Sequence, residues 1–167
     1  LTLAGFLPSL DAPKESAAIA IRALAQHGVE VKVLTGDNEV VTRKICREVG
    51  LDAPQSVLGR DLERKSDSEL EELVERTTIF AKLSPTQKAR VIKALQRRGH
   101  TVGFLGDGIN DAPALREADV GISVDTAVDI AKESAGIVLL EKNLLILGEG
   151  VTHGFSDSAT NSLFLWT

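Results

Sequence analysis

The chain has 167 residues, a length that suits one α/β domain built around a single hydrophobic core. Hydrophobic residues make up 43% and charged residues 26%, which excludes the disordered, collagen-like and coiled-coil classes. The net charge of −5 and the lack of any long basic cluster argue against a nucleic-acid-binding protein.

Few features of the sequence bear on where the protein works. No apolar run approaches the roughly 18–20 residues that span a bilayer, and the first residues do not resemble a signal peptide. Cys46 is the only cysteine, so no disulfide can form within the chain, and its apolar helical surroundings predict a packed thiol in a reducing compartment. The chain begins at Leu1 in a strand-like pattern, so we expect a soluble piece of a longer protein.

The first third of the chain alternates between strand and helix patterns. The expected elements are a strand over 1–6, a helix that follows the Asp11-Ala12-Pro13 cap and ends at Gly28, a strand over 29–34 and a helix over 41–49. Thr35-Gly36-Asp37-Asn38 forms the loop between that second strand and second helix. The unit is a strand, a loop and a helix in succession.

The middle of the chain contains two helix starts with strong local signals. Residues 51–66 are mostly turn and polar material, and we expect them to form a surface insert. A capping box from Ser66 to Glu69 predicts a helix that ends near residue 76. After a short strand over 79–81, Ser84-Pro85-Thr86-Gln87 predicts a second capped helix, which places Lys88 in its first turns.

The remaining elements repeat the same alternation. They are a strand over 101–105, a loop over 106–111, a helix from Pro113, a strand over 120–124, a helix over 127–133 and a strand over 137–140. Strands that alternate with helices of roughly 10–15 residues indicate βαβ units. The predicted fold class is therefore α/β, a doubly wound parallel sheet with helices on both faces.

Three polar clusters follow predicted strands, where the ligands of open parallel sheets bind. They are Thr35-Gly36-Asp37, Lys88 at the start of its helix, and Gly106-Asp107-Gly108-Ile109-Asn110-Asp111. Thr35 and Gly36 can donate hydrogen bonds to phosphoryl oxygens at a helix N-terminus. Asp107 suits Mg²⁺, with Asp111 or Asn110 assisting, and Gly106 and Gly108 would let the backbone approach the ion. Lys88 would supply a positive charge to the phosphoryl group.

Each cluster taken alone also has an ordinary structural interpretation. Thr35-Gly36-Asp37 is a common turn and helix cap, and Lys88 by itself is most simply a solvated helix lysine. The glycine-rich loop resembles a dinucleotide fingerprint, but Asp111 at its sixth position would repel pyrophosphate. Two acidic residues in one glycine-rich loop after a strand are harder to explain as a turn, so this cluster favours a phosphate and magnesium site.

The order of the three clusters resembles a known family. Thr35-Gly36-Asp37, the Pro85-x-x-Lys88 step and Gly-Asp-Gly-Ile-Asn-Asp-Ala-Pro-Ala-Leu at 106–115 resemble the last three signatures of the phosphorylation domain of P-type ATPases, in the haloacid dehalogenase-like superfamily. Asp11-Ala12-Pro13-Lys14 is similar to the entry segment of that domain. The resemblance covers residues 1–152, and residues 153–167 depart from it as an atypical tail.

The resemblance implies a role for each matching residue. Thr35, Gly36 and Lys88 would contact the phosphoryl group, and Asp37 would steady its loop or approach the nucleotide. Asp107 would bind Mg²⁺ with Asp111 as the second metal-site residue, while Asn110 and Asp111 would orient phosphate and its water. The implied cofactor is Mg²⁺, and the implied substrate is ATP.

The resemblance also implies a branch and a setting. Leu105 before Gly-Asp-Gly, with Lys132-Glu133-Ser134 and Leu139-Leu140-Glu141-Lys142, is similar to the bacterial magnesium-transporting branch. The implied partners are nucleotide-binding, actuator and transmembrane domains of the same polypeptide. The implied location is the cytoplasmic side of a bacterial inner membrane.

One family motif does not occur in the sequence. The family phosphorylates the first aspartate of Asp-Lys-Thr-Gly-Thr, and this chain contains no such segment. We therefore expect an incomplete sheet without the nucleophile-bearing strand, and a chain that is inactive alone and prone to associate through unpaired edges. The tail is expected to be foreign or degenerate sequence, or a short packing helix. A stand-alone hydrolase and a degenerate domain that binds Mg²⁺ or phosphate without turnover remain alternatives.

Overall fold

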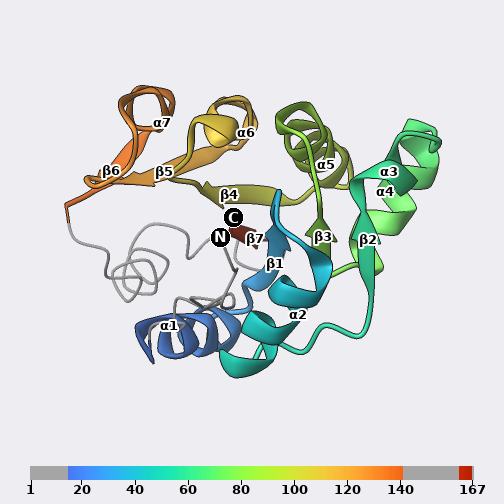
Figure 1. The fold of residues 1–167 in the computed structure, drawn as a ribbon, viewed down its shortest axis with the longest axis horizontal. Coiled ribbons are helices and arrows are strands. Elements are labelled where there is room, and N and C mark those ends of the chain that lie inside the picture. Colours follow the sequence, from blue (N-terminus) through green and yellow to red (C-terminus); the bar gives the residue numbers. More distant parts are fainter. Residues whose placement is uncertain (1–14, 141–161, 167) are drawn as a thin grey trace, which may run out of the picture.

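The computed structural model describes residues 15–140 and 162–166, as strands and helices in alternation (Figure 1). The strand predicted over 1–6 and the Asp11-Ala12-Pro13-Lys14 segment lie outside these residues. The strands are β1 (Glu30–Leu34), β2 (Ser56–Leu58), β3 (Ile79–Ala81), β4 (Thr101–Leu105), β5 (Val120–Val124), β6 (Ile137–Leu139) and β7 (Ser162–Trp166). The helices are α1 (Glu15–Gln26), α2 (Glu39–Glu48), α3 (Gly59–Leu62), α4 (Asp67–Arg76), α5 (Pro85–Arg97), the 3₁₀ turn η1 (Ile109–Asp111), α6 (Ala112–Glu117) and α7 (Asp129–Ser134).

The strands form one parallel sheet in the order β2-β3-β1-β7-β4-β5-β6. Helices α5, α6 and α7 lie side by side over one face, and α1 and α2 cover the opposite face (Figure 1). This arrangement confirms the predicted doubly wound α/β fold. The carboxyl ends of all paired strands therefore meet along one edge of the sheet.

Both predicted capping boxes are present. The Ser66 hydroxyl accepts a hydrogen bond from the backbone N–H of Glu69 at 3.3 Å, and the Glu69 carboxylate accepts one from the backbone N–H of Ser66 at 2.8 Å. At α5, Ser84 and Gln87 make the same reciprocal pair, and Pro85 occupies the first helical position. These bonds satisfy amide groups that a helix start otherwise leaves unpaired.

The predicted surface insert over 51–66 proved partly wrong, because it contributes an edge strand and a helical turn. Strand β2 pairs with β3, and the short helix α3 follows it. Arg90 of α5 donates hydrogen bonds to the backbone carbonyls of Leu62 at 2.9 Å and Lys65 at 2.6 Å. The structure of residues 51–66 thus depends on contacts with β3 and α5, which are distant in sequence. The turn-forming residues within the segment could not predict those contacts.

A buried charge also lies outside the polar clusters. Lys32 of β1 is 1% exposed. Its Nζ donates to the Glu30 carboxylate at 2.7 Å and to the backbone carbonyls of Glu75 at 3.2 Å and Thr77 at 3.1 Å. Three acceptors match the three ammonium donors, so this lysine is satisfied within the fold.

The C-terminal tail contains a feature that the sequence did not predict. Residues 162–166 form strand β7, which lies between β1 and β4 and is parallel to both. The predicted alternative of a short packing helix is therefore wrong for these five residues. Their sequence, Ser-Leu-Phe-Leu-Trp, has the nearly continuous apolar run typical of a central parallel strand.

No helix among residues 15–140 is long and apolar enough to cross a membrane.

Gly121 of β5 offers a test of the packing between the sheet and α6. A Cβ at this position would lie 2.3 Å from the backbone oxygen of Leu115. Because a backbone carbonyl cannot rotate away, we expect Gly121→Ala to lower the free energy of unfolding by about 1–3 kcal/mol in urea titrations. Gly136→Ala is the matched control, since its nearest neighbour would lie at 3.7 Å. Equal stability of the two variants would contradict this packing.

Candidate functional site

The three polar clusters predicted from the sequence lie at the carboxyl edge of the sheet. Thr35 follows β1 directly, Gly106 follows β4 directly, and Lys88 lies in the first turn of α5, after β3. One strand, β7, separates β1 from β4. Two strand spacings amount to roughly 10 Å, so the loops after β1 and β4 face each other across a gap of one strand.

The loop after β1 is held by backbone hydrogen bonds to the segment that precedes α5. The N–H of Leu83 donates to the carbonyl of Thr35 at 3.0 Å, and the N–H of Lys82 donates to the carbonyl of Asp37 at 3.0 Å. The N–H of Asp37 donates to the Thr35 hydroxyl oxygen at 3.1 Å. Thr35 is buried, whereas Gly36 and Asp37 are exposed. The hydroxyl of Thr35 accepts in this turn and keeps its own hydrogen as a donor.

The structure assigns the helix cap to a different residue of this loop. The side-chain oxygen of Asn38 accepts a hydrogen bond from the N–H of Val40 at 2.9 Å and caps α2. The helix cap that the sequence suggested for Thr35-Gly36-Asp37 is therefore provided by Asn38, not by Thr35 or Asp37. Gly36 has room around it, because a Cβ there would lie 3.7 Å from its nearest neighbour.

Sequence reasoning missed the part that Lys82 plays in the site. Lys82 has a φ of 53°, in the left-handed region that non-glycine residues rarely adopt. Its N–H bond to Asp37 and the adjacent Leu83 bond to Thr35 stabilise this conformation. A lysine gives no sequence signal for positive φ. Only the structure therefore shows that the residues after β3 turn to contact the loop after β1.

Lys88 and Asp111 form a buried ion pair that joins α5 to the loop after β4. The Lys88 Nζ lies 2.6 Å from Asp111 Oδ1, and both side chains are 4% exposed. The second oxygen, Oδ2, accepts a hydrogen bond from the N–H of Gly108 at 3.0 Å. The interpretation of Lys88 as a solvated helix lysine is therefore wrong. A buried charge pair needs such partners, because both ions lose their hydration.

The structure explains the glycine at position 106 by a different reason from the predicted one. A Cβ at this position would lie 2.6 Å from the Cβ of Asp111 and 2.9 Å from the Phe104 ring. The missing side chain thus makes room for Asp111 to turn toward Lys88. The predicted reason, space for the backbone beside an ion, fits Gly108 better, since its Cβ would meet only Asp111 Oδ2 at 3.3 Å and the Asn110 nitrogen at 3.9 Å.

In the loop after β4, Asp107 presents an exposed carboxylate, and Asn110 of the same loop is exposed as well. The backbone oxygen of Asp107 accepts a hydrogen bond from Val128 at 3.2 Å, which ties the loop to the start of α7. In the described residues, no group of three or more His, Cys, Asp or Glu side chains is arranged to hold a metal. Mg²⁺ commonly takes only one or two protein carboxylates and completes its shell with water and phosphate, so one exposed carboxylate such as that of Asp107 fits a site of that kind.

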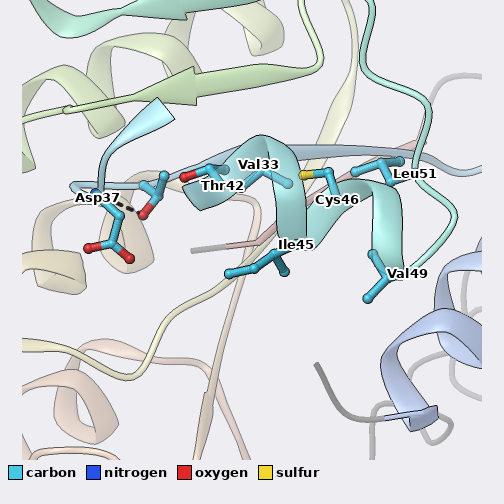
Figure 2. A pocket seen from close by; sticks show the side chains of 8 residues that line it. Val33, Asp37, Thr42, Ile45, Cys46, Val49 and Leu51 are labelled. Atoms are coloured by element: carbon cyan, nitrogen blue, oxygen red, sulfur yellow. Dashed lines mark hydrogen bonds between the residues drawn. The ribbon is translucent and has the colours of Figure 1, made fainter. Parts of the chain in front are cut away.

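A hollow beside the loop after β1 is mostly apolar, unlike the polar clusters. It is lined by Val33, Thr35, Asp37, Thr42, Ile45, Cys46, Val49 and Leu51. Figure 2 shows Asp37 at one end, with mostly apolar side chains of β1 and α2 along the rest. Burial raises the pKa of the Cys46 thiol to about 11, so the thiol stays protonated near neutral pH. Cys46 is a packed thiol, as predicted, and the hollow offers no phosphate-binding charge along its apolar length.

This combination of parallel sheet, strand-end loops and motif order matches a known family. The model of the haloacid dehalogenase-like hydrolase family matches residues 2–119 of this chain. This chain belongs to that family. Its lysine-aspartate pair and its exposed strand-end aspartate are thus features of a haloacid dehalogenase-like domain.

Curated relatives of this haloacid dehalogenase-like domain include much longer proteins. It is 62% identical over 154 residues to "Magnesium-transporting ATPase, P-type 1" of Salmonella typhimurium strain LT2, and 58% identical to the protein of that name from Escherichia coli strain K12. Each match covers 92% of this chain and 17% of the relative, so the chain spans about a sixth of those proteins.

A solved structure supports the fold of the domain. The catalytic domain of the CPx-ATPase CopB-B matches with a TM-score of 0.60, over 84% of this chain and 45% of that chain. At 23% sequence identity this likeness establishes the shared fold alone.

The buried pair predicts a large cost for removing one partner. Lys88→Met leaves the Asp111 carboxylate buried without its cation, and we expect it to lower the free energy of unfolding by about 3–5 kcal/mol. Lys93→Met on the same helix is the control, because the Lys93–Glu117 pair is half exposed at Lys93 and should be worth less than about 1 kcal/mol. Urea unfolding of both variants measures the difference. A loss at Lys88 no larger than that at Lys93 would contradict the assigned pair.

Proposed function

We propose that this chain is part of the cytoplasmic phosphorylation domain of a magnesium-transporting P-type ATPase. It would supply the Mg²⁺- and phosphate-binding half of the site in which an aspartyl phosphate forms and is hydrolysed. The observation that carries the proposal is the buried Lys88–Asp111 pair beside exposed Asp107, facing the Thr35 loop across one strand. The 62% identity to a magnesium-transporting ATPase supports the choice of family branch.

The phosphate would lie between the loops that follow β1 and β4. Thr35 and the Gly36 N–H would donate to phosphoryl oxygens, and the N-terminus of α2 adds partial positive charge nearby. Lys88 would balance the charge that develops on the transferred group. Its position is fixed by Asp111, so the ammonium need not be reorganised during transfer.

Asp107 would provide the protein ligand to Mg²⁺. When bound, Mg²⁺ neutralises phosphate charge and orients the group for in-line attack. Asp111 is buried, and its two oxygens accept hydrogen bonds from Lys88 and Gly108, which leaves little room for it to bind the metal as well. Asp111 would instead position Lys88, and exposed Asn110 would orient phosphate and its water.

Asp37 has a separate place in the proposal. Its carboxylate is exposed, while its backbone carbonyl is bound to Lys82. This geometry suits a residue that steadies the loop and turns its side chain toward the nucleotide. ATP would be the phosphoryl donor, held mainly by a nucleotide-binding domain outside these residues.

The wider setting follows from the relatives and belongs to the same proposal. The nucleophilic aspartate, the nucleotide-binding and actuator domains and the transmembrane helices would lie in other parts of a longer polypeptide. The chain would face the cytoplasm at the inner membrane of a bacterium. Energy from the aspartyl phosphate would drive Mg²⁺ across that membrane.

The metal assignment can be tested without catalysis. We expect Mn²⁺, used in place of Mg²⁺ with inorganic phosphate, to bind weakly and to broaden the amide signals of residues 106–111 in NMR spectra. Asp107→Asn should abolish this broadening, because it removes the charged ligand. Asp52→Asn is the control, since Asp52 is exposed after the carboxyl end of α2, away from the strand-end loops. Unchanged broadening in Asp107→Asn would refute the assignment.

The alternative of a stand-alone hydrolase makes an opposite prediction. Such an enzyme needs its own nucleophilic aspartate, and among the described strands the one between β1 and β4, Ser162–Trp166, contains none. We expect the purified chain to hydrolyse an aryl phosphate in Mg²⁺ no faster than a protein-free blank. Turnover above the blank that disappears in Asp107→Asn would favour the hydrolase and overturn the half-site proposal.

A further inference from the structure

The loop after β1, residues 35–37, is held by a turn that itself contacts a third part of the chain. The N–H groups of Lys82 and Leu83 donate to backbone carbonyls of the 35–37 loop, so the turn after β3 sets the position of that loop. Strand β3 is paired with β2, and the residue that follows β2 therefore lies beside this turn. That residue is Gly59, at the start of α3.

Gly59 is buried against the turn at Lys82 with no space for a side chain. A Cβ at this position would lie 2.4 Å from the backbone oxygen of Lys82 and 2.6 Å from Oε1 of Gln87. A side-chain carbon does not approach other heavy atoms so closely, so glycine is what lets the two segments meet. The end of β2 and the turn after β3 are therefore in direct backbone contact.

Gln87 links Gly59 to the first turn of α5. Its Nε2 donates to the Gly59 carbonyl at 2.9 Å, and its Oε1 accepts a hydrogen bond from the N–H of Ser84 at 2.8 Å. Lys88 is the next residue of this helix, and its side chain is buried. Gly59 therefore contacts both the turn that holds the 35–37 loop and the helix turn that carries Lys88.

A second set of contacts joins the same segment to the other end of the loop. Arg43 of α2 donates to the backbone carbonyl of Ala53 at 2.9 Å and to the Glu39 carboxylate at 3.0 Å. The Ser56 hydroxyl bonds to both side chains. The hydrogen bonds from Ser56 and then Arg43 hold the pKa of Glu39 below its usual value. Because Glu39 is the first residue of α2, residues 53–59 contact the chain on both sides of the 35–37 loop.

The geometry points to Gly59 as a positioning residue for the phosphate site. By letting β2 approach the turn at Lys82, it sets the distance between the 35–37 loop and the start of α5, where Lys88 lies. A larger residue would push the turn away and move the loop with it, although the pairing of β2 with β3 could still complete the edge of the sheet. This role rests on the proposed function, because the distance affects binding only if the loop and Lys88 contact the same phosphoryl group.

The test uses the full chain carrying Gly59→Ala, with inorganic phosphate in the presence of Mg²⁺. The amide shifts of residues 35–37 in NMR titrations give the phosphate affinity. We expect the dissociation constant to rise about tenfold, because a displaced loop loses a charge-assisted hydrogen bond to the ligand. Without ligand, the amides of Lys82 and Leu83 should exchange hydrogen faster, since their bonds to the loop would be distorted.

Gly99→Ala is the matched control for a general loss of stability. Gly99 follows α5 with a φ of 87°, so alanine is strained there, yet its Cβ would meet nothing within 4 Å. Phosphate affinity should be unchanged in this control. Exchange at Lys82 and Leu83 should change no more than at Gly106, whose N–H is bonded to Ile122. An equal loss of phosphate affinity in both variants would overturn the proposal, because stability alone would then explain it.

A second variant, Gln87→Glu, keeps the test decisive if Gly59→Ala does not fold. Glutamate retains an acceptor for the Ser84 N–H but loses the donor to the Gly59 carbonyl. Thr86→Glu adds the same charge at an exposed neighbouring position and is the control. We expect weaker phosphate binding and faster exchange at Lys82 in Gln87→Glu than in Thr86→Glu. Equal behaviour of the two would overturn the proposal.

The two measurements separate this proposal from that of the half-site. If the unsubstituted chain does not respond to phosphate, the half-site proposal fails, and the exchange data still decide whether Gly59 positions the loop. If phosphate binds but Gly59→Ala changes neither affinity nor exchange, the role of Gly59 is refuted and the half-site stands. Faster exchange with unchanged affinity refutes that role as well, because the loop would then move without consequence for the ligand.

Discussion

The ion pair between Lys88 and Asp111 is the contact on which the arrangement of the site depends. It lies where α5, the helix after β3, meets the loop after β4. Both charges are buried, so each fixes the other closely. Gly106 leaves the space that Asp111 occupies, and the Gly108 N–H binds the second carboxylate oxygen. One interaction therefore sets the positions of the lysine, the glycine-rich loop and the exposed Asp107.

Much of this architecture could be predicted from short-range patterns. Apolar periodicity located most of the helices and strands, and the capping boxes at Ser66 and Ser84 marked two helix starts that the structure retains. The rule that ligands bind at the carboxyl ends of parallel strands brought the three clusters together. The element predictions succeeded because each depends on residues within one helical turn or one strand of each other, whereas the convergence of the clusters follows from the parallel sheet itself, which gathers all its strand ends at one edge.

The remaining features depend on contacts between distant parts of the chain. A five-residue apolar run such as 162–166 carries no information about which strands it will join, so the position of β7 was not predicted. The positive φ of Lys82 and the space that Gly106 gives to Asp111 arise from tertiary packing. The burial of Lys88 is a further case, because a lysine early in an amphipathic helix is usually solvated.

The two strand-end loops of the candidate site lie on either side of the central strand. Thr35 follows β1 and Gly106 follows β4, and β7 between these strands keeps the two loops about two strand spacings apart. Contacts outside β7 also hold each loop, because the backbone of Thr35 and Asp37 is hydrogen-bonded to Leu83 and Lys82, and the carbonyl of Asp107 to Val128. In the proposed function a carboxylate would react in the gap between the loops, and β7 contains no acidic residue. The binding half of the site would then keep its geometry without reacting until another segment supplies that carboxylate.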